Sequence, residues 1–179
     1  MTPVILDACV MRSSGDVTAT HPTAETCRDL LNSLREKRRH IALTPDIQNE
    51  WNRHMSRYAR KWLTSMYARK LVFHAYPVSL DAVRAAIPTC ALSSAEKQLM
   101  SKDIHLIEAV YETDGPVVSM DYVARDTYRK YYFALRLRPN IHWTCPLVER
   151  ATNFIWLTLE TKNSVDRLLR VSVRPGALR

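Results

Sequence analysis

The chain has 179 residues, of which 46% are hydrophobic and 25% charged, values that suit one domain with a sizeable core. Only three glycines occur, which excludes a low-complexity or linker-rich protein, and no apolar stretch is long enough to span a bilayer. The formal net charge of +8 favours either solubility alone or an acidic partner such as nucleic acid.

The four cysteines show no CxxC spacing, and the six histidines do not group with them. This pattern argues against a zinc site and favours small, reduced core residues at Cys9, Cys27, Cys90 and Cys145. Met1-Thr2-Pro3 leads directly into an apolar run, unlike a signal peptide. We therefore expect a cytoplasmic protein with no membrane segment.

The amino-terminal half alternates short apolar runs with helical patterns. Cys27, Leu30 and Leu34 have the spacing of one buried helical stripe, and Thr44-Pro45-Asp46 has the cap and the early proline of a helix start. In chain order we expect a strand at 4–6, a polar loop at 12–22, a helix at 23–38, a strand at 41–43, a helix at 45–70 and a strand at 71–73.

The second half continues this alternation. Ser93 and Glu96 fit a capping box, and Asp114-Gly115-Pro116 predicts a turn. We expect a short helix after Ser79 that ends before Pro88, a short helix after Ser93, a helix at 102–112, a strand at 117–118, a helix at 121–135, a strand at 141–143 and a helix at 146–159.

The repeated order of strand and helix predicts the α/β class, as a three-layer αβα sandwich around a five-stranded, mostly parallel sheet. No repeat or linker divides the chain, so we expect a single domain over residues 1–179. Residues 147–179 are expected to be its carboxyl-terminal helix and basic tail, packed on the domain or extending from it.

Four acidic residues stand near expected strand ends and helix starts. Asp7 follows the first strand, and Asp121 lies just past the fourth. Glu50 lies in the second turn of the helix after the second strand, and Asp103 at the start of the helix before the fourth strand. Because functional groups collect at the carboxyl ends of parallel strands, we expect all four to meet at one edge of the sheet.

Crowded carboxylates repel one another, and Mg²⁺ or Mn²⁺ would relieve that repulsion with the oxygen ligands that these ions prefer. We expect Asp7, Asp103 and Asp121 to hold metal, and Glu50 to hold a second ion or orient an attacking water. Ser119 would hydrogen-bond a carboxylate or a substrate phosphate. Asp126 is a candidate fifth acid that would otherwise be exposed.

Each acid also has an ordinary explanation. Asp7 suits a turn, and Glu50 suits a surface ion pair with Arg53 or His54. Asp103 and Asp121 suit helix N-caps. Only the joint placement of the acids favours a functional site over these local roles.

The chain resembles the PIN-domain family, the metal-dependent ribonuclease fold that includes toxins of bacterial toxin–antitoxin pairs. The resemblance spans roughly residues 3–146 and is carried by VILDACV, TPDIQNEW, KDIHLIEAV and VVSMD. It implies a five-stranded parallel sheet and RNA cleavage that depends on Mg²⁺ or Mn²⁺. By position, the metal-binding and catalytic acids would be Asp7, Glu50, Asp103 and Asp121, and an antitoxin protein would be a partner.

The expected long helix also carries a basic face. At 3.6 residues per turn, the candidate RNA-binding residues fall on the same side as Glu50: Arg53, Arg57, Arg60 and Lys61. A plain solvated helix face is the alternative. A second basic and aromatic patch, from Arg125 to Tyr132, would flank the substrate or form a homodimer contact.

Cys9 departs from the family pattern, because many relatives carry Ser, Thr or Asn at that position. The alternative function is therefore a catalytically inactive PIN-like module that binds RNA or protein. A third hypothesis, a Mg²⁺-dependent phosphatase or phosphotransferase, is disfavoured because Asp7-Ala8-Cys9 lacks the second aspartate of the DxD signature. His105, on an apolar helix, is expected to be a packed, hydrogen-bonded histidine.

Overall fold

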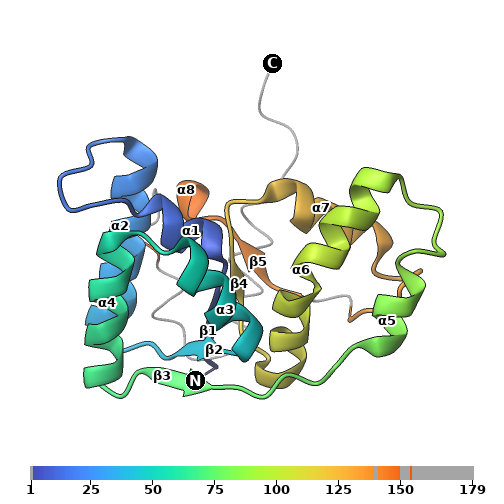
Figure 1. The fold of residues 1–179 in the computed structure, drawn as a ribbon, viewed down its shortest axis with the longest axis horizontal. Helices are drawn as coiled ribbons and strands as arrows, with labels where there is room; N and C mark the ends of the chain where they lie inside the picture. The colour runs from blue at the N-terminus through green and yellow to red at the C-terminus, as the bar shows by residue number, and fades with distance from the viewer. Residues whose placement is uncertain (1, 139–140, 150–153, 155–179) are drawn as a thin grey trace.

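The computed structural model describes residues 2–138, 141–149 and 154. Its five strands form one sheet in the order β3-β2-β1-β4-β5, and every neighbouring pair is parallel (Figure 1). The strands are β1 (Val4–Leu6), β2 (Ile41–Leu43), β3 (Val72–His74), β4 (Val117–Val118) and β5 (Trp143–Thr144). Helices flank the sheet as in a three-layer sandwich, which confirms the expected α/β class.

The central strands are buried because their sequences are apolar without interruption. Every residue of β1, β2 and β4 is buried. A parallel strand covered by helices on both faces requires such a run, because one face of a strand with alternating polar residues would place polar groups in the core. The edge strand β3 is half-buried to exposed.

The strand order reverses between β1 and β4. From β1 the chain proceeds outward through β2 to β3, and it then returns to the other side of β1 to form β4 and β5. The register pairs Leu6 with Val118, so the residues that follow, Asp7 and Ser119, leave the sheet beside each other. Such a reversal point is where parallel α/β proteins commonly form their sites.

The helices form two groups on either side of the strands in Figure 1, with α2 and α4 at the left and α5, α6 and α7 at the right. Their bounds are α1 (Ala8–Ser13), α2 (Pro22–Glu36), α3 (Pro45–His54), α4 (Arg57–Ala68), α5 (Asp81–Ala86), α6 (Ser94–Thr113), α7 (Tyr122–Tyr131) and α8 (Pro146–Glu149). No helix of the described residues is long and apolar enough to cross a membrane.

The single helix expected at 45–70 was wrong, because the chain breaks at Met55 and Ser56 into α3 and α4. Ser56 caps α4 by accepting a hydrogen bond from the backbone N–H of Ala59. Its own N–H donates to the carbonyl of Met11, and its hydroxyl lies 2.8 Å from that of Ser14. Contacts with the end of α1 therefore fix the break.

In contrast, the two separate helical segments expected between 93 and 112 form one continuous helix, α6. The capping box of Ser93 and Glu96 is confirmed. At the other end Asp114 adopts the left-handed conformation, and Gly115 follows. A Cβ on Gly115 would lie 1.9 Å from the Pro3 carbonyl oxygen, so only glycine fits there.

Other boundaries shift by a few residues. Helix α1 was not expected and shortens the loop predicted at 12–22, and α7 ends at Tyr131 rather than at Leu135. The strand predicted at 141–143 lies at Trp143–Thr144. The helix predicted to reach Leu159 is described only as far as Glu149, and the basic tail lies outside the described residues.

Candidate functional site

Asp7 is the N-cap of α1, and its carboxylate collects three hydrogen bonds. Oδ1 accepts from the backbone N–H of Cys9 at 3.1 Å. Oδ2 accepts from the Cys9 thiol at 3.0 Å and from the Ser119 hydroxyl. Asp7 was expected to suit a turn, and it instead caps a helix and makes a long-range contact to the end of β4.

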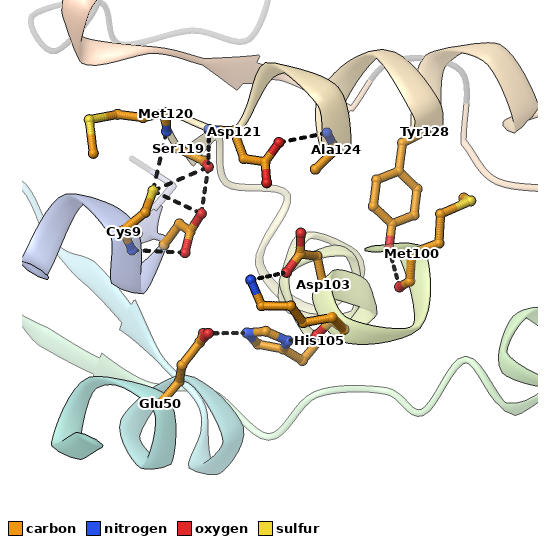
Figure 2. A network of polar contacts seen from close by, with 12 residues as sticks. Cys9, Glu50, Met100, Asp103, His105, Ser119, Met120, Asp121, Ala124 and Tyr128 are labelled. Atoms are coloured by element: carbon orange, nitrogen blue, oxygen red, sulfur yellow. Dashed lines mark hydrogen bonds and ion pairs between the residues drawn. The ribbon is translucent and has the colours of Figure 1, made fainter. Parts of the chain in front are cut away.

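Ser119 connects Asp7 to Asp121. The Ser119 side chain is buried, and its Oγ accepts a hydrogen bond from the backbone N–H of Asp121 at 3.0 Å while donating to Asp7. Asp121 caps α7 by accepting from the N–H of Ala124 at 2.8 Å (Figure 2). The two aspartates thus lie on either side of one serine at the sheet edge, and the expected contact of Ser119 with a carboxylate is confirmed.

Cys9 contributes to the same arrangement. Its sulfur accepts a hydrogen bond from the N–H of Met120 at 3.3 Å and lies 3.5 Å from the Ser119 hydroxyl. Burial and the negative charge of Asp7 raise the pKa of the Cys9 thiol, so it stays protonated and acts as a donor. All four cysteines are free, and Cys27 and Cys145 are buried as expected, whereas Cys9 and Cys90 are only half-buried.

Asp103 lies inside α6, which corrects its expected place at a helix start, and its side chain is buried. Burial raises the pKa of this carboxyl to about 6, and the negative charges of Asp7 and Asp121 add to the increase, against the opposing charge of Lys102. Figure 2 shows the Asp103 and Asp121 carboxylates directed toward one another. Asp103, inside α6, therefore interacts electrostatically with the two aspartates that cap α1 and α7.

Glu50 has a different partner from either one expected. Its Oε2 lies 3.2 Å from Nε2 of His105 on α6, although the direction of the ring N–H does not satisfy hydrogen-bond geometry. The contact with His105 lowers the pKa of Glu50. Burial acts to lower the pKa of His105, but the interaction with Glu50 outweighs it and the net pKa is raised. His105 is thus packed and hydrogen-bonded as expected, since its Nδ1 lies 3.0 Å from the Lys102 carbonyl oxygen, and it faces Glu50 in addition.

Lys102 was missed by the sequence analysis. Its ammonium lies 3.6 Å from the Asp103 carboxylate, and the charge of Asp103, followed by those of Asp7 and Glu50, raises the pKa of Lys102. Its position beside Asp103 in KDIHLIEAV was the available signal. Lys102 therefore lies in the combined field of three of the four candidate acids.

The fit of a divalent ion can be judged from these groups. No set of three or more His, Cys, Asp or Glu side chains in the described part of the chain is arranged to hold a metal. The three aspartates at this edge nonetheless supply carboxylate oxygens, and Mg²⁺ commonly keeps several waters and binds through one or two carboxylates. Asp7, Asp103 and Asp121 fit such a water-rich ion in chemistry, and metal binding remains a prediction.

A cleft of about 880 Å³ opens between α3 and α6, and Glu50 is the one candidate acid among its described lining residues. Glu50 and His105 line one part of it, and its cationic lining residues are Arg53, Arg84 and Lys102. The lining also includes the polar side chains of Asn49, Asn52 and Ser101. The cleft therefore offers a hydrogen-bonding surface of mixed charge next to Asp103.

The basic stripe expected along one helix is not continuous. Arg53 lies on α3 and lines the cleft, whereas Arg57, Arg60 and Lys61 lie on α4 beyond the break at Ser56. Arg57 pairs with Asp16 at 3.3 Å, and all four side chains are exposed. Of the expected set, only Arg53 is thus placed at the cleft beside Glu50.

The remaining expectations concern α7. Asp126 is exposed and pairs with Arg125 at 2.8 Å, so it takes no part in the acid group. Tyr128 is buried and donates to the Met100 carbonyl, and Tyr131 donates to Glu96. These tyrosines therefore hold α7 against α6. The homodimer contact expected of this patch stays a prediction.

Comparison of the chain with protein-family models, curated proteins and solved structures gave no match. The likeness to PIN domains thus rests on the residues quoted above.

Proposed function

We propose that this protein is a metal-dependent endoribonuclease that cleaves RNA phosphodiesters with Mg²⁺ or Mn²⁺. The observation that carries the proposal is the placement of Asp7 and Asp121 on either side of Ser119, at the point where the strand order reverses. Asp103 interacts electrostatically with both. The net charge of +8 suits a polyanionic substrate.

Each side chain has a role in this proposal. Asp7, Asp103 and Asp121 would hold the ion, and Ser119 would fix the orientation of Asp7. A bound divalent ion activates a water and stabilises the leaving oxygen of a phosphodiester. Glu50, held against His105 at the edge of the cleft, would orient the attacking water or hold a second ion.

The cleft would receive the RNA strand. Arg53 and Arg84 line it and would contact phosphates, which gives affinity without reading the base sequence. Lys102 would exchange its contact with Asp103 for a phosphate once an ion neutralises that carboxylate. The likeness to PIN domains supports the same chemistry, and an antitoxin partner enters the proposal through that likeness alone.

A catalytically inactive binding module is the second candidate. Lys102 and His105 already supply positive charge next to Asp103 and Glu50, so the acids are partly compensated by the protein itself. A module of this kind would bind RNA or protein and need not take up Mn²⁺.

The deciding experiment is cleavage of a labelled RNA with Mg²⁺ or Mn²⁺ by the wild type, Asp7→Asn and Asp121→Asn. The exposed Asp126→Asn is the matched control, because it removes one carboxylate of α7 that lies outside the acid group. The proposal expects strong loss in the first two variants and none in the control. Equal cleavage by all would reject it, and absence of Mn²⁺ uptake in calorimetry together with RNA binding would favour the binding module.

A further inference from the structure

A second cavity, of about 220 Å³, lies along α7 beside β5. One side is formed by Arg125, Tyr128, Arg129 and Tyr132, which follow the i, i+3, i+4, i+7 spacing of one helical face. Trp143 of β5 lines it as well, and Arg138 contributes a third guanidinium. The first arginine follows Asp121 by four residues, about one helical turn.

The described lining of this cavity contains three cations and no acid. Arg125 pairs with Asp126 and Arg138 with Asp114, each at 2.8 Å, and neither aspartate belongs to the lining. A guanidinium has five N–H donors in a planar fork, so one such contact leaves donors for a second anion.

Arg129 has the least compensation of the three. No carboxylate of the described residues lies within 4.0 Å of its guanidinium. Burial, followed by the positive charge of Arg125, lowers the pKa of Arg129. Arg129 is exposed, and an anion bound between it and Arg125 would offset the repulsion between these two like charges.

The aromatic side of the cavity is formed by Trp143 and Tyr128. The Trp143 side chain is 4% exposed, and its indole N–H has no hydrogen-bond partner. Its ring packs at 5.9 Å from that of Tyr128. Trp143 and Tyr128 therefore give this cavity an aromatic wall beside its three guanidinium groups.

We propose that this cavity binds the terminal phosphate of a nucleotide, free or at the end of an RNA strand. Three guanidinium groups match a phosphate monoester, which carries up to two charges and three terminal oxygens. Tyr132, which is partly exposed, offers a ring face on which a base can stack. As a strand-end site it rests on the proposed function, since it would hold RNA one helical turn from Asp121.

The test measures binding to the full chain in EDTA, where no cleavage occurs. The probes are 5′-AMP against adenosine, and a short oligoribonucleotide with a 5′-phosphate against the same strand with a 5′-hydroxyl. We expect AMP to bind at least ten-fold more tightly than adenosine. A ten-fold preference for the phosphorylated strand would identify the strand end as the source of the phosphate, and its absence would identify the free nucleotide.

The variants locate the site. Arg129→Gln should reduce AMP affinity at least ten-fold, and Arg129→Lys, which keeps the charge but loses the fork, should lie between it and the wild type. Arg69→Gln, at an exposed arginine at the end of α4, is the control and should bind as the wild type does. Equal binding of AMP and adenosine, or wild-type affinity in Arg129→Gln, would overturn the inference.

The outcome is separable from that of the proposed function. Asp7→Asn should abolish cleavage and leave AMP binding unchanged, because Asp7 does not line this cavity. A nuclease without a phosphate pocket, and a phosphate pocket without nuclease activity, therefore give different results in the two assays.

Discussion

The hydroxyl of Ser119 donates a hydrogen bond to Oδ2 of Asp7, across 112 positions of the chain. The register of β1 on β4 brings the two together, since it pairs Leu6 with Val118 immediately before them. The same hydroxyl accepts from the backbone N–H of Asp121. One serine thus links the Asp7 carboxylate to the backbone of Asp121, whose own carboxylate caps α7 (Figure 2).

Replacement of this serine should loosen the site. Ser119→Ala removes a buried donor to a carboxylate and an acceptor for Asp121, so we expect the free energy of unfolding to fall by about 1–3 kcal/mol. Cleavage of RNA should fall with it, because Asp7 loses its orientation. Urea denaturation of the variant, with the exposed Ser94→Ala as control, measures the first effect. A stability change equal to that of the control would contradict this role of Ser119.

The Cys9 thiol should be a donor and a poor nucleophile. Its pKa is raised by burial and by Asp7, and the thiolate is the reactive form, so Cys9 should react slowly with a disulfide reagent at neutral pH. Cys27 should be slow too, since burial raises its pKa to about 12. The partly exposed Cys90 should react fastest. Loss of the fast phase in Cys90→Ser would confirm this order, and loss of it in Cys9→Ser would contradict it.

Cys9→Ser should preserve the site, whereas Cys9→Ala should weaken it. A serine hydroxyl can donate to Asp7 and accept from the N–H of Met120, as the thiol does, while alanine leaves the Met120 donor unpaired. We expect cleavage near or above the wild-type rate for the serine variant and lower for the alanine variant. Equal rates in both would show that this side chain has no role in orienting Asp7.

Asp103 should destabilise the metal-free protein at neutral pH. Its folded pKa of about 6 lies above the ordinary aspartate value of 3.8, so the folded state binds more protons between these values. The contribution of Asp103 to stability is therefore fully present below pH 3.8 and is lost as the pH rises through about 6. At 1.36 kcal/mol for each pKa unit, the loss is about 2–3 kcal/mol.

Asp103→Asn should accordingly be more stable than the wild type above pH 6 in EDTA, and the advantage should shrink toward pH 4. Thermal denaturation across this range measures it. Addition of Mn²⁺ should stabilise the wild type and not the variant, while RNA cleavage should fall in the variant. A difference in stability that does not depend on pH would contradict the assigned titration.

Glu108 should be a structural acid. It is 3% exposed, and it accepts from the Arg84 guanidinium through both oxygens and from the Leu80 N–H, which holds α5 against α6. Arg84→Met would leave this carboxylate buried with one donor, and the partial exposure of Arg84 limits the cost to about 1–3 kcal/mol. Arg69→Met, at an exposed arginine at the end of α4, is the control in urea denaturation. Equal urea midpoints for the two variants would show that the ion pair of Arg84 and Glu108 contributes nothing to the free energy of unfolding.

Local sequence patterns predicted those strands and helix starts that are determined by residues close together in the chain. The uninterrupted run Val4-Ile5-Leu6 gives a buried strand, and Thr44 caps α3 by accepting from the N–H of Ile47. The acids after β1 and β4 were found for the same reason. A strand end and the residue next to it are both visible in the sequence, and parallel strands place those ends at one edge.

The sequence alone determined the α/β class, the alternation of buried strands with helices, and the location of Asp7 and Asp121 at the carboxyl edge. Only the tertiary structure decided that Ser56 ends one helix and starts another, that Glu50 pairs with His105, and that Lys102 lies beside Asp103. Capping and periodicity act over three or four residues, so they are encoded locally. Ion pairs and helix breaks depend on which distant surfaces meet, and that is settled only when the helices pack on the sheet.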